Sequence, residues 1–314
     1  MKYNVGWWER KQAQNWRTLP EPILGLFSLF LCLRVTSLRC SIQYGIRKEE
    51  TLFSNTMKWP TRLWLIRHDT SAYNMLRDKK AHDSLYQEFL KAFDTNPESD
   101  TTQALARLVS QKFALGIGDA ETPLADLEAK RAITVGQALR KECAALPDVI
   151  FVSPYHRAKA TLAGLVKGFP ELGEIQTYEE ERVREQEHGL SLIYNDWRVF
   201  HALHPEQRKL RELEGPYWYR YPQGENVPDV RERNRSWLTT LTREFSTQSV
   251  FVVTHHLNIL ATRANLERLT AERFIELDER DKPINCGVTA YHGDSTASRN
   301  GRLHLAYYNR RYYS

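Results

Sequence analysis

Three short segments place cationic or nucleophilic side chains directly after apolar runs. Arg67 and His68 follow LWLI, residues 153–157 (SPYHR) follow VIFV, and His255 with His256 follows VFVVT. An imidazole nitrogen is a good nucleophile toward phosphorus, and guanidinium groups present forks of donors that match phosphate oxygens. These residue types therefore predict a site that binds a phosphate group and attacks it.

Hydrolysis of a phosphate monoester requires a nucleophile and a charge clamp. We predict His68 as the nucleophile, because a neutral imidazole can attack phosphorus and later leave again, which divides one hard displacement into two easier ones. Arg67 and Arg157 are predicted to hold the phosphate, since guanidinium groups stay charged at any working pH. A protonated His255 would add a hydrogen-bond donor to the charge that develops on the transferred group.

The leaving oxygen also requires a proton. A carboxylic acid can supply that proton and recover it later from the attacking water. We predict Glu185, in EQEHG, as this general acid, with Glu187 as the alternative. The scheme needs no metal and no cofactor, and the sequence shows no His/Asp/Glu cluster with ligand spacing.

Ser71 and Asn74 follow the Arg67-His68 pair in RHDTSAYN and have two interpretations. Their side chains are predicted to bind phosphate. Either residue also suits the start of a helix, where its side chain accepts a hydrogen bond from a free backbone amide. Both interpretations remain open from the sequence.

The predicted site residues need a sheet to bring them together. Apolar runs at 61–67, 149–152 and 250–254 read as buried strands, and helical patterns such as 124–146 lie between them. Strands that alternate with helices predict a mostly parallel sheet covered on both faces, hence a three-layer αβα sandwich. In such sheets the ligand site lies beyond the carboxyl ends of the strands, where all three polar segments begin.

Two stretches interrupt this alternation. Residues 75–118 contain two predicted helices and form a helical insertion, and residues 186–224 are rich in aromatic and charged residues; both are candidate lids. We predict that residues 57–314, with these insertions, form one domain. Residues 1–56 are expected to be a poorly ordered N-terminal extension.

Composition excludes some classes of function. The chain has 314 residues and a net charge of +5 but no basic run, so it does not indicate a nucleic-acid-binding protein. Its longest apolar run, Ile23 to Leu33, is about half the length of a membrane span, so no stable membrane insertion is expected. Four scattered cysteines favour a reducing, cytoplasmic compartment. A homodimer is left open.

From about Arg62 to Tyr291 the chain resembles the histidine phosphatase superfamily, in the branch of cofactor-dependent phosphoglycerate mutases and fructose-2,6-bisphosphatases. The motifs that carry the resemblance are RHDTSAYN, SPYHRA, EQEHG, YPQGENVPDVRER and VVTHH, which occur in the family's order. The resemblance implies a phosphoglycerate mutase-like fold. It also implies the same roles for His68, Arg157 and Glu185 that the chemistry suggests, with His255 as the second histidine.

The resemblance also bears on the substrate, expected to be a small phosphorylated metabolite. YWYRYPQGENVPDV is similar to the bisphosphatase segment, which implies that Tyr217 and Arg220 touch substrate, and His256 is a further candidate. Gln223 and Leu260 stand where that branch has a lysine and an arginine, which disfavours fructose-2,6-bisphosphate.

Hydrolysis is expected in preference to mutase activity, because HALHPEQRKLRELEG lacks the mutases' adjacent arginine pair. A mutase-like phosphotransferase and a non-catalytic phospho-ligand-binding protein remain alternatives. Asp69 replaces the family's glycine and puts an anion beside the phosphate pocket. We predict that Asp69 faces a backbone amide or an arginine rather than the phosphate.

Overall fold

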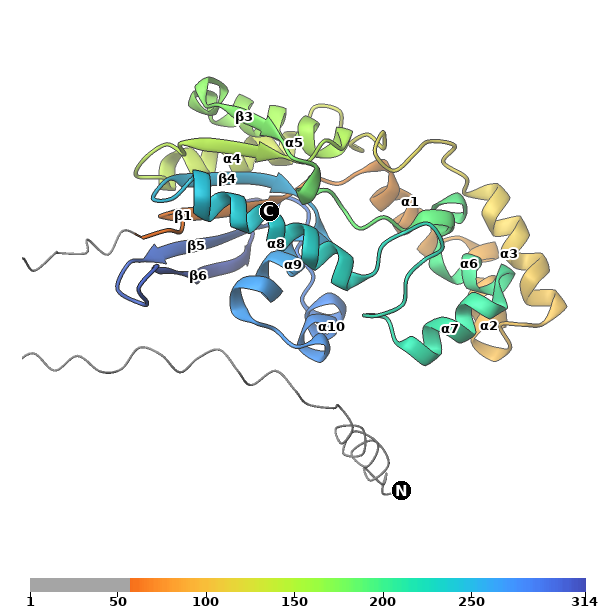
Figure 1. The fold of residues 1–314 in the computed structure, drawn as a ribbon. Helices are drawn as coiled ribbons and strands as arrows, with labels where there is room; N and C mark the ends of the chain where they lie inside the picture. Colours follow the sequence, from red (N-terminus) through yellow and green to blue (C-terminus); the bar gives the residue numbers. More distant parts are fainter. Residues whose placement is uncertain (1–56) are drawn as a thin grey trace, which may run out of the picture. The chain divides into compact units, whose positions relative to one another are not determined.

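The computed structural model describes residues 57–314, and the predicted extension, residues 1–56, lies outside the described residues. A six-stranded sheet forms its centre, with strand order β3-β2-β4-β1-β5-β6 (Figure 1). The strands β3, β2, β4 and β1 run parallel, whereas β5 and β6 are antiparallel to their neighbours. The bounds are β1 Arg62–Arg67, β2 Val149–Val152, β3 Thr177–Glu179, β4 Ser249–Thr254, β5 Val288–Asp294 and β6 Arg302–Arg310.

Helices cover both faces of the sheet. Alternate residues of a strand point to opposite faces, and in β1 the apolar residues on both faces are buried. Trp64 and Ile66 pack toward α4 (Lys130–Glu142) and α5 (His156–Gly168). Leu63 and Leu65 pack toward α8 (Val227–Glu244) and α9 (His256–Glu267). The predicted three-layer αβα sandwich with a mostly parallel sheet is therefore confirmed.

The two stretches that interrupt the alternation are helical and pack on each other. The first contains α1 (Ala72–Ala81), α2 (Ser84–Thr95) and α3 (Asp100–Lys112), and the second contains η3 (Gly189–Tyr194), α6 (Trp197–Leu203) and α7 (Pro205–Glu214). Phe89, Val109 and Val199 belong to a hydrophobic cluster that joins α2, α3 and α6. These helices lie together beside the sheet in Figure 1 and have a core of their own.

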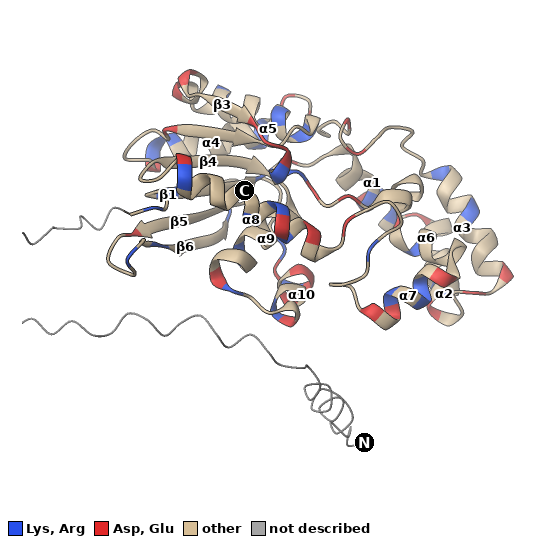
Figure 2. Cartoon of the chain, in the orientation of Figure 1, with Lys and Arg blue, Asp and Glu red and all other residues tan. Residues whose placement is uncertain are grey.

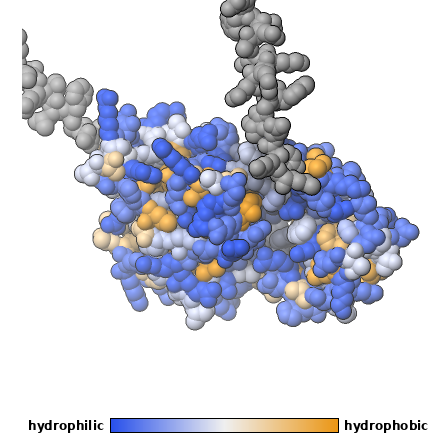
Figure 3. All heavy atoms as spheres, turned by 90° about the horizontal axis from the view of Figure 1, so that it is seen from below, coloured by the Kyte–Doolittle hydropathy of each residue, from blue (hydrophilic) through white to orange (hydrophobic). Residues whose placement is uncertain are grey.

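The remaining described elements are short or lie at the periphery: η1 (Pro170–Glu174), η2 (Glu181–Val183) and α10 (Ala271–Arg280). Acidic and basic residues are interspersed along α7 and α10 (Figure 2). The face seen in Figure 3 is mostly hydrophilic, with small separate hydrophobic patches. Within residues 57–314 no helix has the length and apolar character needed to span a bilayer.

A buried ion pair joins the two helical stretches. The Lys80 Nζ lies 2.8 Å from Asp196 Oδ2 and donates to the carbonyl oxygen of Asn195 at 2.7 Å. The Tyr86 hydroxyl donates to the same Asp196 oxygen at 2.6 Å. Asp196 also caps the N-terminus of α6, so this cluster fixes α1 and α2 against α6.

Lys80→Met is expected to destabilise the protein by about 3–5 kcal/mol, because it leaves a buried carboxylate without its cation. Urea unfolding followed by circular dichroism measures the change. Lys79→Met, at an exposed position of the same helix, is the matched control and should change the free energy of unfolding by less than about 0.5 kcal/mol. Equal values for the two variants would contradict a stabilising role of the pair.

Candidate active site

Three adjacent parallel strands bring the predicted residues to one edge of the sheet. The strands β2, β4 and β1 are neighbours in that order, so their carboxyl ends lie side by side. The rings of His68, after β1, and His255, after β4, have centroids 5.0 Å apart. The His68 amide donates to the carbonyl oxygen of Thr254 at 2.9 Å. The convergence expected from the strand ends is therefore observed.

The hydrogen bond of His68 fixes which ring nitrogen can react. Its Nδ1 lies 2.6 Å from the carbonyl oxygen of Asp69. Since a carbonyl oxygen can only accept, Nδ1 carries the proton and Nε2 keeps the lone pair. Burial, reinforced by the nearby Arg157 and Arg67, holds the pKa of His68 well below 6.5. The side chain is therefore neutral at pH 7, as a nucleophile requires.

His255 is also neutral in the ligand-free protein. Burial, followed by the effects of Arg157 and His68, holds its pKa well below 6.5, so the expectation of a protonated His255 does not hold in this state. Its Nε2 lies 2.7 Å from Ser153 Oγ, and its Nδ1 is buried without a partner among the described residues. If the serine hydroxyl donates, the one ring proton is on Nδ1 and remains available to an incoming phosphate oxygen.

Arg67 lies at the end of β1 and stays cationic at neutral pH. Burial lowers its pKa to about 10. Its Nη1 donates to the carbonyl oxygen of Pro283 at 2.7 Å, which leaves other guanidinium nitrogens for a ligand. Arg67 also lines a cavity of about 380 Å³.

Arg157, the other predicted phosphate ligand, is paired with a carboxylate of the protein. Its Nη1 and Nη2 donate to the Oδ1 and Oδ2 of Asp119 at 2.9 and 3.2 Å. Asp119 belongs to the segment between α3 and α4. In the same segment, the carbonyl oxygen of Ala120 accepts a hydrogen bond from the His156 amide. The two parallel hydrogen bonds of this pair have the same geometry as those that an arginine makes to a phosphate. A phosphate must therefore displace the Asp119 carboxylate to bind both Nη1 and Nη2 of Arg157.

Asp119→Asn is expected to tighten the binding of inorganic phosphate by about tenfold, because the variant removes the competing charge from Arg157. Isothermal titration calorimetry measures the dissociation constant. Glu121→Gln, in the same segment but exposed, is the control for the loss of one negative charge and should bind phosphate like the parent protein. Unchanged or weaker binding by Asp119→Asn would show that Asp119 does not compete with phosphate.

The carboxylate of Glu185 binds the N-terminus of α9, at the amide two residues after His255. Its Oε1 accepts hydrogen bonds from the amides of Gln186 and Leu257, both at 3.0 Å. Its alternative, Glu187, instead forms an ion pair with Arg184 at 3.0 Å. The geometry therefore favours Glu185 as the carboxyl group of the site.

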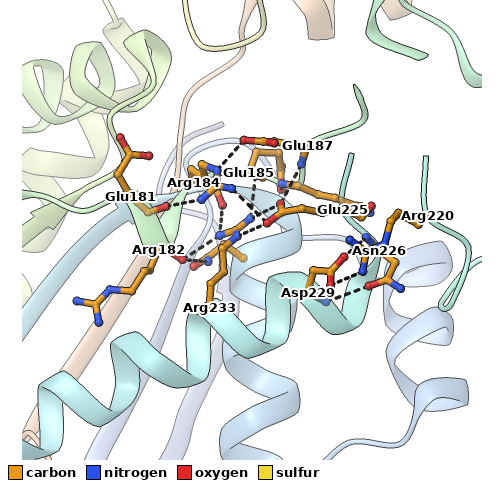
Figure 4. Close-up of polar contacts among 12 residues, drawn as sticks. Glu181, Arg182, Arg184, Glu185, Glu187, Arg220, Glu225, Asn226, Asp229 and Arg233 are labelled. Atoms are coloured by element: carbon orange, nitrogen blue, oxygen red, sulfur yellow. Dashed lines mark hydrogen bonds and ion pairs between the residues drawn. The ribbon is translucent and has the colours of Figure 1, made fainter. Parts of the chain in front are cut away.

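A partly buried arginine holds the loop that carries Glu185 (Figure 4). Arg233, on α8, donates to the carbonyl oxygens of Arg182, Arg184 and Glu185 at 2.8–2.9 Å. It also pairs with both carboxylate oxygens of Glu225 at 2.8 and 3.0 Å. The sequence assigned no role to Arg233, although the YPQGENVPDVRER motif contains it.

Ser71 and Asn74 form a capping box at the start of α1. The Ser71 hydroxyl accepts from the Asn74 amide at 3.3 Å, and Asn74 Oδ1 accepts from the Ser71 amide at 3.1 Å. Asn285 donates to Asn74 Oδ1 at 3.2 Å and to the carbonyl oxygen of His68 at 3.1 Å. The capping interpretation is thus observed, and it braces the turn that follows His68.

The three candidate substrate residues occupy different surroundings. Tyr217 is buried in a hydrophobic cluster and accepts a hydrogen bond from Arg231 at 2.6 Å. Arg220 is exposed and pairs with Asp229 at 2.7 Å. Only His256, whose Nε2 lies 2.7 Å from an Asp278 oxygen, lines the cavity beside Arg67.

Asp69 has the partners that were predicted for it. Its Oδ1 accepts from the Thr70 amide at 2.6 Å and from Arg131 Nη1 at 3.1 Å. The predicted orientation toward a backbone amide and an arginine is confirmed. No three His, Cys, Asp or Glu side chains of residues 57–314 come together as a metal-ligand set.

Part of the chain is similar in sequence to two curated plant proteins. The Arabidopsis thaliana phosphoglycerate mutase-like protein AT74H is 36% identical over 94 residues, which are 30% of this chain and 31% of that protein. The aligned part thus spans about a third of the length of the curated relatives.

Solved structures share the fold. A protein described as mycobacterial hydrolase 1 superposes with a TM-score of 0.54 at 20% identity, over 80% of this chain and 99% of the other. The mycobacterial glucosyl-3-phosphoglycerate phosphatase gives a TM-score of 0.53 at 19% identity, over 79% and 98%. At these identities the likeness shows the fold alone.

A family model described as histidine phosphatase superfamily (branch 1) matches residues 112–299. This range contains Arg157, Glu185 and His255, whereas Arg67 and His68 precede it. The matched range is more than half of the chain and includes strands from the centre of the sheet. The chain belongs to the histidine phosphatase superfamily, branch 1.

Proposed function

We propose that the protein is a metal-independent phosphatase that hydrolyses a phosphate monoester of a small metabolite through a phosphohistidine at His68. The observation that carries the proposal is the state of the His68 ring. Its proton is held on Nδ1 by a carbonyl oxygen, its Nε2 lone pair is free, and its low pKa keeps the ring neutral. Family membership supports a phosphatase or a mutase-like activity.

In the first step, His68 Nε2 attacks phosphorus and the bond from phosphorus to the leaving oxygen breaks. Arg67, Arg157 and the ring N–H of His255 stabilise the charge on the transferred group. Glu185 gives its proton to the leaving oxygen. The products of this step are an alcohol and the phosphorylated histidine.

In the second step, water attacks phosphorus and the nitrogen–phosphorus bond breaks. Glu185 takes the proton from the attacking water, which restores its starting state, and inorganic phosphate leaves with His68 neutral again.

A mutase-like transfer is the second candidate, and the names of the Arabidopsis relatives favour it. It shares the phosphohistidine and differs in the acceptor, which is a second hydroxyl group instead of water. A phospho-ligand-binding protein without catalysis is the third candidate. We also propose a cytoplasmic location, on the four scattered cysteines of the sequence.

One assay separates the three candidates. The purified protein is incubated with a panel of phosphate monoesters in EDTA, and both free phosphate and isomerised ester are measured. We expect free phosphate from at least one ester. An isomerised ester without free phosphate would favour the mutase, and ester binding in calorimetry without any conversion would favour the binding protein.

A further inference from the structure

Ser153, the first residue after β2, makes a buried hydrogen bond to the second histidine of the site. Its Oγ lies 2.7 Å from His255 Nε2. Both residues have an exposed fraction of 0%, so bulk water does not reach the atoms of this hydrogen bond. The position of the proton between the two side chains therefore depends on the protein atoms around them.

The other contacts of the serine hydroxyl indicate the direction of this hydrogen bond. A hydroxyl group has one proton to donate and accepts through its lone pairs. Ser153 Oγ accepts from the amide of Tyr155 at 3.4 Å. Within residues 57–314, its remaining hydrogen-bond partner is His255 Nε2. If His255 donated from Nε2, the serine proton would have no acceptor there, so these contacts favour donation from Ser153 to Nε2.

This direction leaves His255 with one tautomer. Burial, followed by the effects of Arg157 and His68, holds the pKa of His255 well below 6.5, so the neutral ring has a single N–H. If Nε2 accepts, that proton is on Nδ1. Nδ1 is buried and has no hydrogen-bond partner in the described part of the chain. A buried donor without an acceptor is costly, unless a ligand supplies the acceptor.

The surroundings of His255 suit a phosphate group. The centroids of the His68 and His255 rings are 5.0 Å apart, and Arg157 and Arg67 are among the cations that act on His255. The Tyr155 ring packs against His255 at a centroid distance of 5.1 Å and an angle of 71°. The Arg157 guanidinium lies 4.9 Å from the centre of the same Tyr155 ring. This packing restricts the orientation of the His255 ring and of its N–H.

We propose that Ser153 is a positioning residue, which selects the Nδ1–H tautomer of His255 so that a neutral histidine donates a hydrogen bond to the phosphate. The catalytic part of this inference rests on the proposed hydrolysis at His68, whereas the tautomer does not. Ser153 contacts no reacting atom and acts through His255. A neutral donor also works at pH 7–8, where an imidazolium with the ordinary pKa of about 6.5 would be mostly deprotonated.

The first test determines the tautomer in the ligand-free full chain. The protein is labelled with ¹⁵N-histidine, and long-range ¹⁵N–¹H correlation spectra distinguish the two neutral tautomers from the imidazolium. The signals of His255 are identified by their loss in His255→Asn. At pH 7 we expect the neutral Nδ1–H tautomer. The Nε2–H tautomer or the imidazolium in the parent protein would overturn the inference, and this measurement requires no variant of Ser153.

The second test removes the serine hydroxyl. In Ser153→Ala, the ¹⁵N shifts of His255 should move toward the Nε2–H tautomer. We expect kcat to fall by about tenfold, the order expected for one hydrogen bond between neutral groups. The change in KM should be smaller, because the hydrogen bond acts mainly on charge that develops in the transition state.

The control is Ser84→Ala, at an exposed position on α2, which should keep the ¹⁵N shifts and the kcat of the parent protein. If the His255 shifts are the same in Ser153→Ala and in the parent protein, the serine does not select the tautomer. A changed tautomer with an unchanged kcat would overturn the positioning role.

Failure of the proposed function is detected separately. If the parent protein hydrolyses no ester, the hydrolysis at His68 is wrong, while the spectra of the ligand-free protein still determine the tautomer of His255. The contact with phosphate is then tested by adding inorganic phosphate. Saturation with phosphate should shift the Nδ1 and Nδ1–H signals of His255. If these signals do not change, His255 does not donate to phosphate and the inference is overturned.

Discussion

Replacement of His68 by asparagine is expected to lower kcat by about 10⁴-fold or more, because the variant has no ring nitrogen to form the phosphoenzyme. Asparagine is a suitable replacement in this buried position, since its amide N–H can keep the hydrogen bond that Nδ1 makes to the carbonyl oxygen of Asp69. The loss should therefore appear in the chemical step with little change in stability.

Two measurements check this result. Phosphate release gives kcat, and quenching in alkaline detergent during turnover of a radiolabelled ester traps protein-bound phosphate that is stable in alkali and is lost in acid. The parent protein should show the bound label and the His68→Asn variant should not. The control is His292→Asn, an exposed position on β5, which should keep both signals. Substantial turnover by His68→Asn would refute the phosphohistidine mechanism.

Replacement of Glu185 by glutamine is expected to lower kcat by about 10²–10⁴-fold on alkyl phosphates, whose alkoxide leaving groups require a proton. The effect on p-nitrophenyl phosphate should be much smaller, because nitrophenolate leaves without protonation. The glutamine carbonyl oxygen can still accept from the amides of Gln186 and Leu257. The side chain should therefore keep its position and lose only the acid.

The dependence on the leaving group separates an acid role from a structural role. A merely structural defect would lower the rates on both kinds of ester to a similar degree. Glu181→Gln, an exposed position in the preceding turn, serves as the control and should behave like the parent protein. Glu187→Gln tests the alternative acid. If Glu187→Gln shows the leaving-group effect and Glu185→Gln does not, the assignment of the acid is wrong.

The architecture could be predicted because its signals are local. Apolar runs of strand length, helical patterns between them and polar residues after three strands were enough to predict a parallel sheet with a site at its carboxyl edge. The neighbouring order of β2, β4 and β1 then places His68 beside His255. The partners of Asp69 were also predictable, since an anion beside a phosphate pocket needs compensation.

Other features of the site depend on contacts between distant segments and have no pattern in the sequence. Asp119 reaches Arg157 from an irregular segment between two helices, and nothing in the sequence indicates where that segment lies. Arg233 holds the Glu185 loop through backbone carbonyl oxygens, which every residue possesses. The neutral state of His255 follows from burial and from neighbouring cations, and these are properties of the assembled site.

The pair of Arg157 with Asp119 has a consequence for the end of the catalytic cycle. If Arg157 binds the phosphate group as proposed, the free energy of its pair with Asp119 opposes the binding of ester and of product alike. A returning Asp119 competes with the inorganic phosphate that hydrolysis leaves behind. In the proposed mechanism this exchange would speed the release of inorganic phosphate at the expense of affinity for the ester.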